Sequence, residues 1–302
     1  MWFKNLNLFH LTEPFTFNAD ELAEKMETLR FRPCGAHEES SYGWTAPLGN
    51  SGQALVHATN GYMMLCVKKQ ERVLPTAVIN EMLMEKVADA EEKQGYKPSK
   101  KERTRLRDEL IFDLLPRAFT FSRKTYAYID PKNGWLIVDA AASNKAEDLL
   151  SLLRKSLGSL PAAPINTTNN PVKVMTQWLV SQNTPDDIVV EDECELRSPG
   201  EEASIIRCKR QDLALPEIQN HLDTGKEVIQ LALNWADRLS FVLDKNYAIK
   251  RVRFLDLVQD QLKDMEIEDE ETRFDVDFAI MSAEFATFVP RITELFGGVT
   301  QP

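Results

Sequence analysis

The hydrophobic pattern of the first 75 residues predicts alternating strands and helices. Apolar and aromatic positions with partial alternation predict a strand over 2–11, and Asn18 with Glu21 three residues later resembles a capping box that begins a short helix. Gly, Pro, Asn and Ser are dense over 43–61, which predicts turns, and the apolar run at 62–67 predicts a buried strand. This part of the chain has the pattern of an α+β protein.

Residues 76–116 have the pattern of a helical hairpin. Apolar residues recur at helical spacing from Thr76 to Gln94, and a Gly- and Pro-containing turn at 95–98 interrupts them. Ser99 and Glu102 then form a capping box for a second helix, which ends at the proline that closes the segment. We therefore predict two helices that pack against each other and project from the rest of the chain.

The next segment predicts a β-hairpin followed by a helix. Two apolar runs at 126–139 flank the Asn133-Gly134 pair, whose residues tolerate the positive φ angles of a tight turn. Asn144 and Glu147 resemble another capping box at the start of a leucine-rich helix.

The second half of the chain predicts a mixture of short helices and an antiparallel meander. The elements we expect, in chain order, are a connector at 161–170, a helix at 172–180, a strand at 205–206, a helix from Pro216, strands at 228–233, 239–243 and 248–254, and at 274–296 a strand followed by a helix.

These elements predict an α+β fold with antiparallel sheets and a projecting helical hairpin. We divide the chain into a central α+β body formed by 1–75 plus 117–180, a hairpin projection at 76–116, and a C-terminal α+β domain at 181–302.

The overall charge argues against a nucleic-acid-binding protein, but its distribution changes that view. The 302 residues include 36 Lys and Arg against 47 Asp and Glu, a net charge of −11. Counted by region, 1–150 is nearly neutral at −1, whereas 185–204 carries −7 and 254–302 carries −9. Two segments are basic: 205–253 carries +3, and 93–107 carries +6 in fifteen residues. The acidity is regional, and two basic segments stand out from it.

Motifs for metals, membranes and secretion are absent from the sequence. The four cysteines form no C-x-x-C pair and the four histidines no i, i+4 pair, so we expect no metal and no cofactor. The N-terminus has no uninterrupted apolar segment of a signal peptide, and no stretch is apolar enough to span a bilayer. We expect a cytoplasmic protein with reduced thiols and no membrane partner.

Known catalytic motifs are also absent from the sequence, and one pair of acids is the remaining candidate for a catalytic site. No G-x-G-x-x-G, Walker A or G-x-S-x-G motif occurs. Asp130 and Asp139 end the two strands of the predicted β-hairpin, where paired carboxylates can do acid–base or metal chemistry. The alternative, that they only terminate and solubilise the strands, is favoured because no third acid accompanies them. We predict that the protein is not an enzyme.

The basic cluster at 93–107 has two interpretations. Lys97, Lys100, Lys101 and their basic neighbours have few matched acids, and such cations gain affinity for DNA by releasing counterions condensed on its phosphates. The alternative interpretation is that these basic residues only form the solvent-exposed face of a helix and bind no partner.

The second basic segment lies in strand-rich sequence, where alternation limits what can touch one partner. Arg207, Lys209 and Gln211 are expected on one face and Arg210 on the other. Lys250 and Arg251 are expected to face opposite ways for the same reason. We interpret the segment as a basic patch.

Two phenylalanines follow the helical hairpin. Phe119 and Phe121 share one face of a predicted strand, where they could belong to the core. Alternatively, an aromatic at the end of a projection could anchor a partner subunit, because aromatics are enriched at interface centres.

Several long segments resemble the RdgC family of recombination-associated proteins. The resemblance covers nearly the whole chain and is carried by residues 2–6 (WFKNL), 31–35 (FRPCG), 114–119 (LLPRAF), 146–161 and 209–235. It implies a ring-shaped homodimer that binds duplex DNA, and single strands more weakly, through its central hole without sequence specificity. It further implies a nucleoid-associated protein, without catalytic activity, that restrains RecA-mediated recombination and has a role in replication-fork repair.

Individual residues carry over from this resemblance. Lys209, Arg210, Gln211 and Lys226 match a basic DNA-facing segment, which often reads Lys-Lys-Gln where this chain has Lys-Arg-Gln. Phe119 matches an aromatic at the dimer contact formed by the helical projection, and Arg117 lies in the same matching segment. If basic residues line the hole and acids cover the outside, the electric field would draw DNA inside.

Three functional hypotheses remain open from the sequence. The leading one is a sequence-independent duplex-DNA clamp. The second is an acidic protein-interaction module that captures RecA directly, with the acids of 264–271 in the contact. The third is nuclease activity through Asp130 and Asp139.

Overall fold

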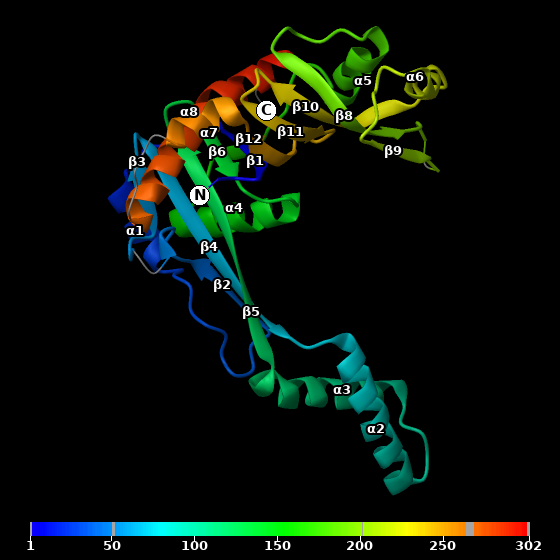
Figure 1. The fold of residues 1–302 in the computed structure, drawn as a ribbon. Coiled ribbons are helices and arrows are strands. Elements are labelled where there is room, and N and C mark those ends of the chain that lie inside the picture. The colour runs from blue at the N-terminus through cyan, green and yellow to red at the C-terminus, as the bar shows by residue number, and fades with distance from the viewer. Residues whose placement is uncertain (1, 50–51, 201, 264–268, 301–302) are drawn as a thin grey trace.

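An antiparallel sheet of twelve strands runs through the molecule, with helices on its faces (Figure 1). The computed structural model describes residues 2–49, 52–200, 202–263 and 269–300. The strands in chain order are β1 (Asn5–Leu11), β2 (Ser40–Trp44), β3 (Val56–Thr59), β4 (Tyr62–Val73), β5 (Phe119–Asp130), β6 (Trp135–Val138), β7 (Ala162–Pro164), β8 (Ile188–Arg197), β9 (Ile205–Lys209), β10 (Glu227–Trp235), β11 (Leu239–Asp244) and β12 (Ile249–Phe254). Eight α-helices accompany them in the described residues: α1 (Ala19–Glu27), α2 (Thr76–Gln94), α3 (Lys100–Leu114), α4 (Ser143–Leu157), α5 (Pro171–Ser181), α6 (Pro216–Asp223), α7 (Asp256–Lys263) and α8 (Glu270–Leu295). The predicted α+β class with antiparallel pairing is confirmed.

The sheet consists of two halves joined at one strand pair. Its order is β2-β4-β5-β6-β1-β12-β11-β10-β8-β9, with β3 beside β4 and β7 beside β1. The pairing of β1 with β12, which sets Leu6 opposite Ile249, connects the N-terminal half-sheet to the C-terminal half-sheet. The expected meander is present as β10, β11 and β12.

The two half-sheets differ in how many faces they bury. In β4, Met64 belongs to a core shared with the C-terminal half, whereas Met63 and Leu65 belong to a second core on the opposite face, beneath α1 and α4. The C-terminal half-sheet packs α5, α6, α7 and α8 into one core on a single face. Within the described residues no layer of helices covers its other face, which we call the open face; a sheet buries both faces only when each carries such a layer.

Helix α8 spans both halves and corrects the prediction for the C-terminal segment. The whole of Glu270–Leu295 is helical, so the strand expected at its start is wrong. Phe278 packs against Tyr128 of the N-terminal half, with ring centroids 5.8 Å apart, and Phe288 packs against Phe241 of the C-terminal half at 4.9 Å. Apolar residues along one face of this helix pack against both half-sheets. The helical spacing of these residues outweighs the short alternation of apolar and polar residues at the start of the segment.

The helical hairpin stands away from the sheet at the end of a ribbon of two long strands, which β2 flanks as far as Glu71 (Figure 1). Helices α2 and α3 have the predicted positions, and Ser99 and Glu102 form the predicted capping box. The ribbon is formed by β4 and β5, which stay paired from Met63 opposite Ile129 to Val73 opposite Phe119. Among the described residues of α2 and α3, Ile79 and Leu110 are the buried ones.

Two other local expectations are corrected. The segment 43–61 was expected to hold only turns, but it contributes the end of β2 and all of β3. Helix α4 begins at Ser143 with no side-chain cap, so the expected capping box of Asn144 and Glu147 is absent. Half of the acidic segment 185–204 forms strand β8. None of the described helices is long and apolar enough to span a membrane.

Candidate nucleic-acid interface

Four basic side chains gather on the open face of the C-terminal half-sheet. They line one hollow of about 360 Å³ and are contributed by two strands, β9 and β12. This sheet-face cluster consists of Arg207, Lys209, Lys250 and Arg251. The expected shared face of Arg207 and Lys209 is confirmed, because strand alternation sends both away from the core.

The placement of Lys250 and Arg251 corrects the prediction that they face opposite ways. Arg251 has a φ of +54°, and the register of β12 against β11 shifts between Ser240 and Val242. Such a bulge inserts a residue and breaks the alternation of side chains. Both basic side chains therefore reach the open face, and the inward-facing pattern resumes at Val252.

Carboxylates accompany every member of the sheet-face cluster. Arg207 lies 2.7 Å from Glu195, and Lys250 lies 2.7 Å from Asp244. Glu193 is shared, at 2.7 Å from Arg251 and 3.9 Å from Lys209. The hydrogen bond from Arg251 lowers the pKa of Glu193, although burial opposes this.

The acids of β8 were expected to cover an outer surface, separate from the basic segment. Instead, Glu193 and Glu195 lie opposite Lys209 and Arg207 in the β8–β9 register. Sequence reasoning missed this interleaving, although the alternation of Glu191, Glu193 and Glu195 with other residues is a strand signal. Because such ion pairs at a surface are weak, these cations can exchange a carboxylate for another anion.

The structure separates the four residues that the family resemblance brings together. Lys209 belongs to the sheet-face cluster, but Arg210 follows the last residue of β9 with a φ of +54° and is exposed. The amide of Gln211 donates to Glu217 at 2.8 Å, away from that hollow. Lys226 precedes β10, whose first residue pairs with Arg197, about 13 Å along β8 from the partner of Lys209.

The hairpin carries a second basic group, the basic residues of 93–107, which we name the hairpin cluster. All seven cations are exposed, including the predicted Lys97, Lys100 and Lys101. Among the described residues, the one ion pair within the cluster joins Arg105 to Glu109 at 3.4 Å. Glu102 caps α3 and is held by Ser99. Lys100 and Lys101 stand in the first turn of α3, where the helix dipole disfavours cations.

Exposed apolar side chains gather on the hairpin and at its base. Phe119 is 86% exposed and Phe121 is 48% exposed, so the interpretation of these residues as core does not hold within one chain. Met84, Tyr96 and Phe112 of the same projection are also exposed. A projection that leaves this much apolar surface uncovered has the composition of an interaction surface. Arg117 lies exposed beside it, in the turn that precedes β5.

The base of the hairpin is held by specific contacts. The ring of His37 stacks on Phe112 with centroids 3.9 Å apart. Arg72 of β4 donates to the carbonyls of Gly35 at 3.0 Å and Ala118 at 3.2 Å.

Asp130 and Asp139 do not form a paired site. They lie at opposite ends of the β5–β6 hairpin, because Asp130 pairs with Trp135 whereas Asp139 follows β6 beside Tyr126. Asp130 accepts from the backbone and side chain of Asn133, and Asp139 accepts from the backbone of Lys4 and Asn5. Burial raises the pKa of Asp139. Both carboxylates close local turns and strand ends, and within the described residues no group of three or more His, Cys, Asp or Glu is placed to hold a metal.

Part of the acidic segment 264–271 has structural roles, and part cannot be described. Asp269 caps α8 by accepting from the amide of Thr272 at 2.8 Å, and Glu270 and Glu271 stand in the first turn, where the helix dipole favours acids. Residues 264–268 lie outside the described residues.

Comparison with known proteins identifies close relatives over the full length. The family model described as "Putative exonuclease, RdgC" matches residues 1–299. The "Recombination-associated protein RdgC" of Tolumonas auensis is 47% identical over 298 residues, covering 99% of each chain. The proteins of that name from Aeromonas hydrophila and Pseudomonas aeruginosa are each 44% identical, over 301 and 303 residues, covering 100% of this chain and 99% of theirs.

Proposed function

Because this chain belongs to the RdgC family of recombination-associated proteins, we propose that it binds DNA without sequence specificity and prefers duplex over single strands. The observation that supports this most is the sheet-face cluster, where Arg207, Lys209, Lys250 and Arg251 converge on an open sheet face of an otherwise acidic protein. Flexible cations held by weak pairs suit phosphates, which carry no sequence information. DNA binding of this kind would place the protein on the nucleoid.

The proposal includes a homodimer that closes a ring around DNA. The exposed apolar side chains of the hairpin support it, with Phe119 and Arg117 in the contact between chains. Enclosure would supply residence time, because DNA could leave only when an interface opens. Individual phosphate contacts can then be few and weak. Occupation of duplex DNA by such rings would restrain RecA-mediated recombination and act at replication forks under repair. Direct capture of RecA through the acids of 264–271 stays an alternative prediction.

The proposed role is non-catalytic, although the matching family model carries an exonuclease description. The reason is the placement of Asp130 and Asp139, which lie at opposite ends of a β-hairpin, where Asp130 accepts from Asn133 in the turn and Asp139 accepts from the backbone at the start of β1. Release of nucleotides from labelled duplex in the presence of Mg²⁺, lost in an Asp139→Asn variant, would overturn this part of the proposal.

The test of the DNA-binding proposal is the dependence of duplex affinity on salt. The logarithm of the binding constant should fall linearly with the logarithm of salt concentration, between about 50 and 200 mM. Arg207→Ala, Lys209→Ala and Lys250→Ala, each within the sheet-face cluster, should each flatten the slope by about 0.9, one phosphate contact apiece. Lys132→Ala removes an exposed lysine from the β5–β6 turn and serves as the matched control. Affinity that ignores salt and all three substitutions would contradict the proposed interface.

A further inference from the structure

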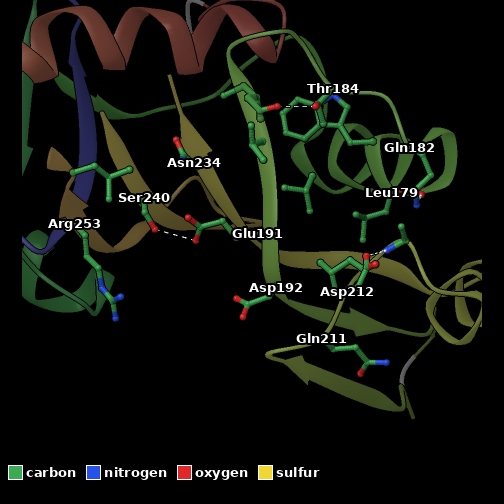
Figure 2. A pocket seen from close by; sticks show the side chains of 17 residues that line it. Leu179, Gln182, Thr184, Glu191, Asp192, Gln211, Asp212, Asn234, Ser240 and Arg253 are labelled. Carbon is green, nitrogen blue, oxygen red and sulfur yellow. Dashed lines mark hydrogen bonds between the residues drawn. The ribbon is translucent and has the colours of Figure 1, made fainter. Parts of the chain in front are cut away.

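A cavity distinct from the sheet-face hollow lies beside the first half of β8. Its volume is about 820 Å³, in the range of ligand and peptide sites. We name it the β8 cleft. Helix α5 contributes Trp178 and Leu179, and the segment after β9 contributes Leu213. In Figure 2, Leu179 and Asp212 lie on one side of β8, whereas Glu191 points to the other side, toward Ser240.

One residue of β8 presents unpaired backbone groups to this cleft. The amide of Ala236 donates to the carbonyl of Asp187 at 2.8 Å. In the antiparallel register, the backbone N–H and C=O groups of Asp187 and Val189 therefore point toward β10, and those of Val190 point to the outer edge of β8. On that outer edge β9 pairs only from Glu193 onward.

The carbonyl groups two positions before and two positions after Val190 already accept hydrogen bonds. The carbonyl of Ile188 accepts from the hydroxyl of Thr184 at 2.7 Å, and the carbonyl of Asp192 accepts from the amide of Gln211 at 3.2 Å. Among the residues that the structure describes, no bond outside the sheet ladder reaches Val190. An unpaired donor and acceptor on a strand edge is a template for a further strand.

The charge around the cleft is acidic. Glu191, Asp192 and Asp212 line it, against a single basic residue, Arg253. Asp212 accepts from the amide of Ala214 at 2.9 Å, which holds its carboxylate at the rim. A cleft with this balance repels phosphates and attracts cations.

Exposed apolar side chains flank the same cleft. Val189 is 56% exposed on β8, and Leu215 is 42% exposed just before α6. Val189 itself lines the cavity, next to Ile188 and Val190. Apolar walls, a free strand edge and acids at the rim together describe a surface for an extended chain.

We propose that the β8 cleft docks an extended segment of a partner protein with alternating apolar and basic residues, which adds as a strand to β8 at Val190. In such a strand, alternate side chains point in opposite directions. Apolar side chains would pack on Trp178, Leu179 and Leu213, and basic side chains would reach Asp192 and Asp212. The inference concerns a protein partner and does not depend on the proposed DNA interface.

The experiment uses the full-length chain and a fluorescein-labelled peptide of alternating lysine and valine, six residues long. Fluorescence anisotropy should show saturable binding, and a peptide of alternating glutamate and valine should not bind. Asp192→Asn with Asp212→Asn should weaken binding about tenfold. The matched control, Asp89→Asn with Asp108→Asn, makes the same change of net charge on the hairpin and should leave affinity unchanged.

A second measurement reports on the strand edge itself. Addition of the lysine–valine peptide should slow hydrogen exchange at the amide of Val190 at least severalfold, because that amide gains an acceptor. Equal loss of affinity in the two double variants would mean a diffuse charge effect and overturn the proposal. Unchanged exchange at Val190 would overturn it as well. Altered self-association of Asp192→Asn with Asp212→Asn in sedimentation would assign the cleft to a second copy of this chain and overturn it too.

Discussion

The sheet-face cluster and the hairpin cluster both concentrate basic side chains, but they hold those charges in different ways. On the sheet, Glu193, Glu195 and Asp244 pair with four cations. On the hairpin, seven cations have Arg105–Glu109 as their one ion pair among the described residues. Each cation on the sheet therefore has a carboxylate partner that competes with DNA phosphates for it, whereas the hairpin presents nearly all of its charge to solvent. Total charge in a segment is a poor guide to the charge that a polyanion meets.

The largest expected effect tests whether the open charge of the hairpin reaches DNA. Lys97→Ala, Lys100→Ala and Lys101→Ala combined should flatten the salt slope of duplex binding by about 2.7, and weaken binding about a hundredfold near 0.15 M salt. The measurement is a titration at several salt concentrations. Substitution of three exposed acids of α2 by glutamine, at Glu81, Glu85 and Glu92, is a control on the same projection. An unchanged slope in the lysine variant would restrict DNA contact to the sheet.

The second prediction separates the two regions by what they do to self-association. Phe119→Ser should raise the dimer dissociation constant about thirtyfold, because a large aromatic at an interface centre contributes at least about 2 kcal/mol. Analytical ultracentrifugation across a dilution series measures it. Val180→Ser, which changes an exposed apolar residue on α5, should leave the dimer intact. A dimer that is equally stable in both variants would show that the exposed hairpin surface is not the contact.

The third prediction concerns the competing carboxylates of the sheet. Glu193→Gln removes the partner of both Arg251 and Lys209, so duplex affinity should rise about threefold to fivefold. Glu227→Gln, at an exposed position of β10 with no ion pair among the described residues, is the matched control. If Glu193→Gln weakens binding, the carboxylate positions these cations rather than competes for them.

The smallest effect is on stability and follows from the lowered pKa of Glu193. A carboxyl whose pKa falls on folding binds protons less readily in the folded state, so its contribution is present above pH 4.5 and is lost as the pH falls through the lowered pKa. Urea unfolding at pH 7 should show Glu193→Gln less stable by under about 1 kcal/mol, because the pair is partly exposed. At pH 3 the difference should nearly vanish. A larger difference at pH 3 than at pH 7 would contradict this account.

The sequence predicts elements well where local signals agree. The hairpin helices combine helical spacing, a turn and the Ser99–Glu102 capping box, and the structure has them at the predicted positions. Prediction fails where two patterns compete. The start of α8 alternates like a strand, but long-range packing of Phe278 and Phe288 on two half-sheets selects the helix.

The site illustrates a different limit. Arg207 and Lys209 share a face because strand alternation is a local rule, so sequence suffices for them. The bulge at Arg251 and the pairing of β8 with β9 depend on register, which no local pattern specifies. These two features decide which cations meet and which acids accompany them.

The β4–β5 ribbon has a mechanical consequence. The pairing of β2 with β4 ends at Glu71, and beyond the strands the helices of 19 and 15 residues extend about 28 Å from the sheet. The hairpin therefore acts as a cantilever, in which a tilt of about 10° at the stacked His37 and Phe112 rings moves the tip by roughly 5 Å. Helix α8 packs against both half-sheets and so stiffens the rest of the molecule. Compliance is thus concentrated in one slender arm, and displacement of that arm needs no repacking of either core.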